Sequence, residues 1–171
     1  AAAVARGVAR GGTGSRVVVF AGDGATSIHL GALLHAKEDI IYVCANDQGY
    51  GMLNHRLDRS FARELALHAS YVATASVSFP HDYIAKLKKA ASLPGFKFIE
   101  LRTPSPSTWQ YESSNTIEVG RVAVETGIWP LFEVENGSVT LTKRPNRLDP
   151  VENFNHVQRG MQISKENLPT T

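Results

Sequence analysis

The apolar and polar positions of this chain alternate between short unbroken apolar runs and longer amphipathic stretches. The run RVVVFA at residues 16–21 is β-branched and almost wholly apolar, which predicts a strand buried on both faces. The run DIIYVCAND at residues 39–47 predicts a second buried strand that ends in polar residues. Further strands are predicted at residues 71–77 and from residue 97 onward, and Asn136-Gly137 predicts a late two-strand hairpin.

The amphipathic stretches between these runs have apolar positions at the helical period and are separated by turn residues. In the stretch that follows residue 24, Ile28, Leu30, Leu33 and Leu34 are expected to supply the apolar side of a helix. The predicted helices cover residues 1–10, 25–38, 60–69, 83–92, 116–127 and part of 150–160.

Strands that alternate with helices predict an α/β fold, a doubly wound and mainly parallel sheet of strands with a C-terminal β-hairpin. In such sheets, ligands bind beyond the carboxyl ends of the strands, next to helix N-termini. We expect a single domain over residues 1–171. Its first residues resemble a helix entered midway, as in an N-terminally truncated chain, and residues 163–171 are expected to form a loose tail.

Composition and charge narrow the class of protein. The 171 residues suffice for one domain with a core, and a net charge of +2 gives no support to nucleic acid or an anionic membrane as a partner. No apolar stretch reaches the roughly 20 residues that span a bilayer, and no signal peptide is recognisable. The single cysteine, Cys44, excludes an internal disulfide and fits a reducing compartment, so a cytoplasmic location is expected.

The motif Gly22-Asp23-Gly24 follows the first predicted strand directly. Its glycines permit a tight turn and the close approach of backbone to a ligand, and the helix that follows directs free N–H groups into the same space, which suits a phosphate. Because an aspartate repels a phosphate, a cation between the two is expected, and Mg²⁺ prefers such oxygen ligands. On this motif alone, a structural turn capped by Asp23 or a dinucleotide-binding glycine turn stays open.

A second polar motif, Asn-Asp-Gln-Gly-Tyr at residues 46–50, follows the next predicted strand. Asp47 lies 24 residues after Asp23, a separation that matches two adjacent strand ends joined by one crossover helix. The two carboxylates are therefore expected to converge on one ion, with a backbone carbonyl in the Gln48-Gly49 turn as a third ligand.

Together the two motifs resemble the thiamine-diphosphate-binding signature, in which GDG is followed at about this spacing by Asn-Asn or Asp-Asn and then by an aromatic residue. The resemblance implies that Asp23, Asp47 and the carbonyl of Gly49 bind Mg²⁺. It also implies that Gly24 and Ala25 offer N–H groups to the diphosphate. The implied cofactor-binding residues are Gly22, Asp23, Gly24, Ala25, Asp47, Gly49 and Tyr50.

Longer stretches narrow this resemblance. YVATASV, TIEVGRVAVETGIWPLFEVENG and RLDPVENF are similar to the C-terminal half of the β subunit of pyruvate:ferredoxin oxidoreductase and related 2-oxoacid:ferredoxin oxidoreductases. The similarity runs over residues 1–160 with one gap. It implies oxidative decarboxylation of a 2-oxoacid to an acyl-coenzyme A, with electrons passing to ferredoxin. It also implies an α-type partner subunit without which the chain is inactive, and no catalytic residue is assigned within the chain.

Three features depart from the family's pattern. Asp47 stands where Asn is usual, and its added negative charge favours weaker cofactor binding or a changed metal preference. Ser105 takes the place of a cluster-binding cysteine, which disfavours an iron–sulfur cluster at this loop. The segment at residues 51–67 is shorter, so the particular 2-oxoacid is not implied. A cluster-free thiamine-diphosphate decarboxylase or transferase subunit, or a non-catalytic paralogue with an assembly role, therefore stays open.

The remaining reactive side chains favour structural interpretations. His29 and His55 are close enough in sequence to contact diphosphate or substrate, but helix-surface or loop positions without a role are favoured. Cys44 is expected to be a small core residue. The run of Lys86, Lys88 and Lys89 is expected to form a solvated helix face.

Overall fold

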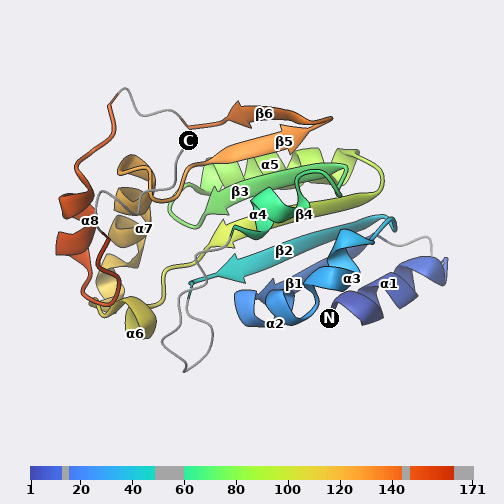
Figure 1. Cartoon of the computed structure of the whole chain (residues 1–171), viewed down its shortest axis with the longest axis horizontal. Helices are drawn as coiled ribbons and strands as arrows, with labels where there is room; N and C mark the ends of the chain where they lie inside the picture. Colours follow the sequence, from blue (N-terminus) through green and yellow to red (C-terminus); the bar gives the residue numbers. More distant parts are fainter. Residues whose placement is uncertain (13–15, 49–59, 144–146, 164–171) are drawn as a thin grey trace.

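The computed structural model describes residues 1–12, 16–48, 60–143 and 147–163, and these residues form one six-stranded sheet (Figure 1). The strand order is β1-β2-β4-β3-β5-β6; the first four strands in this order are parallel, and β5 and β6 are antiparallel. The predicted class, a mainly parallel α/β sheet with a C-terminal hairpin, is confirmed. The strands are β1 (Val17–Gly22), β2 (Ile40–Asn46), β3 (Tyr71–Ser76), β4 (Phe96–Arg102), β5 (Phe132–Glu135) and β6 (Ser138–Leu141).

Helices cover both faces of the sheet, and a separate group lies beyond the carboxyl ends of the parallel strands (Figure 1). One face packs on α1 to α4 through a core that includes Leu33, Phe61 and Phe98, and the opposite face packs on α5 through Ile99 and Ala90. The third core joins α6, α7 and α8. The helices are α1 (Ala2–Arg10), α2 (Asp23–Ile28), α3 (Leu30–Leu34), α4 (Phe61–Leu65), α5 (Pro80–Ser92), α6 (Pro106–Trp109), α7 (Thr116–Glu125) and α8 (Val151–Val157), with a 3₁₀ turn at Ser113–Asn115.

The predicted hairpin turn is confirmed, and a second glycine turn follows α7. Asn136 and Gly137 join β5 to β6 with φ angles of 51° and 75°, the left-handed pair that a two-residue hairpin turn requires. Gly127, with φ of 76°, follows the end of α7, where a residue with a side chain would be strained.

The first strand and the helix after it differ from expectation. β1 lies at the edge of the sheet, and while Val19 is buried, Val18 and Phe20 on the opposite face are 46% and 67% exposed. The prediction of a strand buried on both faces was therefore wrong for the described residues. The single helix predicted over residues 25–38 is instead two short helices, because the backbone leaves the helical region at His29. This break leaves Ile28 71% exposed, although it was expected on the apolar side.

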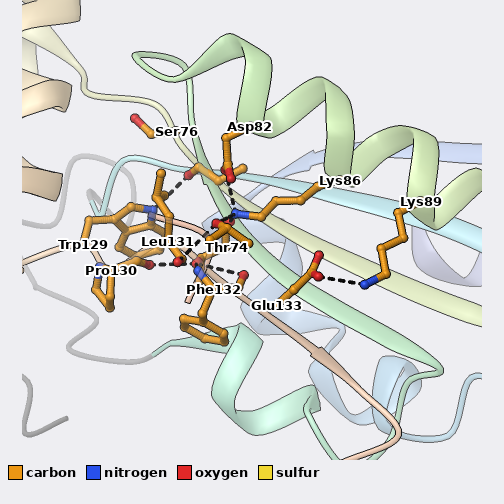
Figure 2. A network of polar contacts seen from close by, with 12 residues as sticks. Thr74, Ser76, Asp82, Lys86, Lys89, Trp129, Pro130, Leu131, Phe132 and Glu133 are labelled. Carbon is orange, nitrogen blue, oxygen red and sulfur yellow. Dashed lines mark hydrogen bonds and ion pairs between the residues drawn. The ribbon is translucent and has the colours of Figure 1, made fainter. Parts of the chain in front are cut away.

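The lysine run is also not a solvated face. Lys86 is only 2% exposed, and its side chain extends from α5 toward Thr74 and Asp82 (Figure 2). Its Nζ donates to the carbonyl of Thr74 at 2.8 Å, to Asp82 Oδ2 at 2.6 Å and to Thr142 Oγ1 at 2.7 Å. Of the other two lysines, Lys88 is exposed, whereas Lys89 forms ion pairs with two glutamates of β5.

The same region holds the hairpin to the sheet. Thr74 Oγ1 donates to the carbonyl of Pro130 at 2.7 Å and accepts from the N–H of Phe132 at 2.9 Å (Figure 2). Trp129 Nε1 donates to the carbonyl of Ala75 at 2.9 Å. These contacts fix the start of β5 beside β3 and bury the indole of Trp129 near the carboxyl end of the sheet.

Candidate functional site

Asp23 lies where β1 ends and α2 begins, at the carboxyl edge of the sheet. Its side chain is 7% exposed; Oδ1 accepts from the N–H of Gly24 at 2.8 Å, whereas Oδ2 has no hydrogen-bond partner among the described residues. Burial raises the pKa of the Asp23 carboxyl, the Gly24 amide opposes this, and the negative charge of Asp47 raises it further. A buried carboxylate oxygen without a donor is costly in a fold and is expected where a ligand or ion binds.

Thr26 fixes the turn that carries Asp23. It is fully buried, and its Oγ1 donates to the carbonyl of Gly22 at 2.8 Å. The same oxygen lies 3.2 Å from Tyr42 Oη and 3.2 Å from Cys44 Sγ, both on β2. The first turn of α2 is therefore held against two neighbouring strands. Thr26 was not singled out from the sequence, where one hydroxyl residue in a helix gives no distinctive signal.

Gly22 is not required by the packing of the described residues. Its φ is −76°, which any residue adopts, and a Cβ added at this position would meet only the carbonyl oxygen of Ala45 at 4.0 Å. The position is exposed, so the glycine leaves room for the close approach of another molecule. Of the two predicted N–H donors, Gly24 already donates to Asp23, and Ala25 is exposed at the start of α2.

The end of β2 brings the second motif to the same edge. Gly22 of β1 pairs with Ala45 of β2 in the parallel register, so Asp23 and Asn46 follow at adjacent strand ends. Asn46 is 2% exposed, and its Oδ1 accepts from the N–H of Gln48 at 2.7 Å, which supports the left-handed backbone of Gln48. The predicted residues Gly49 and Tyr50 lie outside the described residues, as does His55.

Two residues of α6 donate hydrogen bonds to Asp47. Thr108 Oγ1 donates to Asp47 Oδ2 at 3.3 Å, and Trp109 Nε1 donates to the carbonyl of Asp47 at 2.6 Å. The loop that carries Ser105 therefore positions the second carboxylate. The sequence pointed to this loop only as the place of a cysteine, and neither contact was predicted.

Two buried charged residues of β4, Glu100 and Arg102, lie beside Asn46 at the end of β2. Glu100 is fully buried, and its carboxylate accepts from Asn46 Nδ2 at 2.6 Å, from Ser60 Oγ at 3.1 Å and from the N–H of Ala62 at 2.8 Å. Arg102, two residues further along the same face of β4, is 1% exposed. Neither was predicted, although charges at alternate positions of a buried strand are an available signal.

These residues fit a hard divalent cation bound together with a phosphate. Two carboxylates, Asp23 and Asp47, follow the ends of adjacent strands, and Asp23 keeps an oxygen without a partner among the described residues. The described part of the chain contains no group of three or more His, Cys, Asp or Glu side chains suited to a metal ion. A cation here would therefore complete its coordination with other oxygen atoms, such as backbone carbonyls or the phosphate itself.

Comparison with known proteins agrees with this chemistry. Residues 1–101 match the family model described as "Thiamine pyrophosphate enzyme, C-terminal TPP binding domain". The pyruvate synthase subunit PorB of Methanothermobacter marburgensis is 37% identical over 196 aligned residues, which cover 93% of this chain and 67% of that protein. The chain belongs to the β-subunit family of the 2-oxoacid:ferredoxin oxidoreductases.

Other members of this family and a solved structure support the assignment. The ketoisovalerate oxidoreductase subunit VorB of Pyrococcus abyssi is 33% identical, covering 93% of this chain and 62% of that protein. A 2-oxoglutarate:ferredoxin oxidoreductase from Magnetococcus marinus, solved with 2-oxoglutarate, coenzyme A and succinyl-CoA bound, matches with a TM-score of 0.55 and 25% identity. That match covers 62% of this chain and 45% of the other. The chain thus spans roughly two thirds of these β subunits and less of the solved chain.

Within this β-subunit family, the position of Ser105 has a clear structural use here. Ser105 is the N-cap of α6: its Oγ accepts from the N–H of Thr108 at 3.5 Å and lies 3.2 Å from Thr108 Oγ1. The one cysteine of the chain, Cys44, lies in the core of β2, where burial raises its pKa to about 12. Neither residue supplies a thiolate at the loop. Among the described residues, no helix has the length and apolar character needed to cross a membrane.

Proposed function

We propose that this chain binds Mg²⁺ and the diphosphate of thiamine diphosphate as the β subunit of a pyruvate-type 2-oxoacid:ferredoxin oxidoreductase. The observation that carries the proposal is that Asp23 and Asp47 follow the ends of adjacent strands, with a buried oxygen of Asp23 lacking a partner among the described residues. The family match over residues 1–101 includes both carboxylates.

Each residue has a defined part in this proposal. Asp23 Oδ2 and the Asp47 carboxylate bind the metal, with the carbonyl of Gly49 as a third protein ligand. Gly22 leaves room for the diphosphate, and the N–H of Ala25 faces it. Thr26, Asn46 and Trp109 hold these groups in place through the hydrogen bonds described above.

Bound thiamine diphosphate supplies the nucleophilic carbon that lets a 2-oxoacid lose CO₂. This chain's own residues bind and orient the diphosphate end and exclude water around Asp23. The names of the relatives support pyruvate or a similar 2-oxoacid as substrate, and the Magnetococcus structure supports coenzyme A as acyl acceptor. An α-type subunit and ferredoxin are the proposed partners, and the cytoplasmic location stays a prediction.

The test is calorimetric titration of the complex of this chain and its α-type partner with thiamine diphosphate in excess Mg²⁺. Asp23→Ala is expected to weaken binding by at least about a hundredfold, because a metal ligand is lost. Asp149→Ala removes an exposed carboxylate elsewhere and is expected to have no effect. Gly22→Ala tests the room for the diphosphate: binding weakens while the melting temperature stays unchanged. Wild-type complex that binds no thiamine diphosphate contradicts the proposal.

A cluster-free thiamine-diphosphate subunit is the second candidate, and the N-cap role of Ser105 favours it. The visible spectrum of the purified complex separates the two. Broad absorption from an iron–sulfur cluster that persists after Ser105→Ala supports the oxidoreductase with cluster ligands outside this loop. No such absorption, with thiamine diphosphate still bound, supports the cluster-free subunit.

A further inference from the structure

Glu100 lies in β4, where its two carboxylate oxygens accept hydrogen bonds from two different parts of the chain. Oε1 accepts from Asn46 Nδ2 at 2.6 Å, and Asn46 is the last residue of β2. Oε2 accepts from the N–H of Ala62 at 2.8 Å and from Ser60 Oγ at 3.1 Å, both at the start of α4. Because the Glu100 side chain is 0% exposed, these hydrogen bonds form without competition from water.

The contact with Glu100 fixes the orientation of the Asn46 amide. Because a carboxylate oxygen accepts, Nδ2 of Asn46 faces Glu100 and Oδ1 faces the other way. Oδ1 accepts from the N–H of Gln48 at 2.7 Å. Asn46 is 2% exposed, so water does not replace either partner. A chain of hydrogen bonds therefore runs from Gln48 through Asn46 to Glu100.

Gln48 needs this support because its backbone is left-handed. Its φ is 56°, a region that is unfavourable for residues with a side chain and ordinary for glycine. An Asn two residues earlier whose side chain accepts the N–H stabilises such a turn. Gln48 stands between Asp47 and Gly49, the two residues of this motif that the proposed function assigns to the metal. The hydrogen bonds of Glu100 thus reach the backbone between these two residues.

Asp47 is also held from another direction. Thr108 and Trp109 of α6 donate to its carboxylate and its carbonyl, respectively. These contacts do not involve Glu100, so they remain when Glu100 is substituted. A change at Glu100 is therefore expected to weaken ligand binding rather than abolish it.

We propose that Glu100 is a positioning residue that holds, through Asn46, the left-handed turn at Gln48. This turn presents Asp47 to the cation. The inference rests on the proposed function and deepens it, since Glu100 is fully buried and acts through Asn46 rather than by touching the metal or the diphosphate. A residue that only stabilises the fold would, on substitution, lower the melting temperature without changing ligand affinity. A positioning residue changes both, and its effect on affinity disappears when the turn no longer needs support.

The experiment uses the complex with the α-type partner and the variant Glu100→Gln. The Gln oxygen remains toward the buried N–H of Ala62 as a weaker acceptor, and Nε2 turns toward Asn46. The Asn46 amide then rotates, and its Nδ2 faces the N–H of Gln48 in place of Oδ1. Thiamine diphosphate affinity in excess Mg²⁺ is measured by calorimetry, and Mn²⁺ affinity without thiamine diphosphate by electron paramagnetic resonance. Both ligands are expected to bind about tenfold more weakly, the scale seen when a residue that orients a metal ligand is replaced.

Gln48→Gly tests whether the turn carries this effect. Glycine adopts the left-handed backbone without help, so Gln48→Gly added to Glu100→Gln is expected to recover most of the lost affinity for both ligands. The melting temperature stays lowered, because the contacts of Glu100 are still missing. Lys86→Met is the matched control: it removes a buried hydrogen-bonded charge of α5, lowers the melting temperature and changes neither affinity.

Asn46→Ala interrupts the same chain of hydrogen bonds while Ser60 and Ala62 still bond to Glu100. It is expected to weaken both ligands to a similar extent, and it supplies the measurement if Glu100→Gln does not assemble. Wild-type affinities in these variants, or a loss that Gln48→Gly does not recover, overturn the inference. An equal loss of affinity in Lys86→Met also overturns it. If the wild-type complex binds neither Mn²⁺ nor thiamine diphosphate, the proposed function itself fails, and that result is distinct.

Discussion

Two buried cations, Lys86 and Arg102, show how differently one sheet treats charge at its two sides. Lys86 is 2% exposed and donates to three oxygens within 2.8 Å, one of them in the Asp82 carboxylate (Figure 2). Arg102 is 1% exposed and lies over two indole rings, with no acceptor among the described residues. Both charges are shielded from water, yet the described fold satisfies only the first.

The difference separates a charge that joins elements of the fold from one that the described fold leaves without acceptors. A buried charge that is fully hydrogen-bonded holds elements together, and Lys86 joins α5, β3 and the segment after the hairpin. A buried charge without acceptors contributes little to holding the fold together, and it interacts instead with the charged groups around it. For Arg102 these are Glu100, Asp47 and Asp23, all at the candidate site.

The largest expected effect comes from Lys86→Met. The change leaves Asp82, the carbonyl of Thr74 and Thr142 without their buried donor, and it is expected to lower the free energy of unfolding by about 3 kcal/mol. Urea unfolding followed by circular dichroism measures it. Lys88→Met, at an exposed position of the same helix, is the matched control and should stay within about 0.5 kcal/mol of wild type. Equal losses of stability in the two variants would contradict the prediction that the buried hydrogen bonds of Lys86 stabilise the fold.

Glu100→Gln is expected to have the next largest effect, about 2 kcal/mol of destabilisation. The carboxylate accepts three hydrogen bonds, and an amide in its place turns an N–H₂ group toward at least one of these donors. Hydrogen exchange at the Ala62 N–H, which bonds to Glu100 Oε2 at 2.8 Å, is expected to become faster. Exchange at Ala62 that matches wild type would show that Glu100 does not hold the start of α4.

Glu38 forms ion pairs with two arginines of α1, and these pairs are expected to have a smaller effect on stability that depends on pH. Glu38 accepts from Arg6 at 2.9 Å and Arg10 at 2.6 Å, and the Arg6 guanidinium, chiefly, lowers the Glu38 pKa from 4.5 to about 2. Because the folded pKa is lowered, the stabilisation by Glu38 is fully present above pH 4.5 and is lost as the pH falls through about 2. Glu38→Gln should cost about 1 kcal/mol at pH 7, and this cost should disappear as the pH falls through about 2.

The control for this prediction is Glu112→Gln, at an exposed position whose side chain forms no ion pair within the described part of the chain. Thermal unfolding of both variants at a series of pH values measures the difference. A loss in Glu38→Gln that is the same at every pH would contradict the ionic origin of the stabilisation.

The smallest expected effect on stability is that of Arg102→Met, within about 1 kcal/mol of zero. An apolar side chain of similar length removes a poorly satisfied buried charge, and such replacements are often neutral or stabilising. Urea unfolding beside Lys86→Met completes the comparison of the two cations. A loss as large as that of Lys86→Met would show that Arg102 is also needed for folding.

The sequence was a good guide where a motif or an apolar run carries the information. Asp23 and Asp47 were predicted to meet because two apolar runs and one crossover helix place them at adjacent strand ends. The parallel register confirms the adjacent strand ends, with Asp23 level with Asn46, and the convergence of the two carboxylates on one ion stays a prediction. The exposure of Phe20 could not be foreseen, because RVVVFA has the same composition at the edge of a sheet as in its centre. Lys86 was misjudged because its partners, Thr74 and Thr142, are brought to it only by the tertiary fold.

Arg102 and Glu100 were missed for another reason. In KFIELR they stand near the end of a strand, where polar residues are ordinary, and only the neighbours show that both are buried. Their spacing by two positions on one face of a buried strand was a usable signal. The contacts of Thr108 and Trp109 with Asp47 join residues more than sixty positions apart, which a local pattern does not reveal.

The single cysteine offers a way to measure how often β2 opens and how ligand binding changes that rate. Cys44 is 0% exposed in the middle of β2, and burial raises the pKa of its thiol to about 12, so reagents for thiolates do not reach it in the folded chain. Its rate of alkylation in native buffer therefore reports how often β2 detaches from its neighbours. Since β2 leads directly to Asn46 and Asp47, any molecule that binds at its end should slow alkylation in proportion to occupancy.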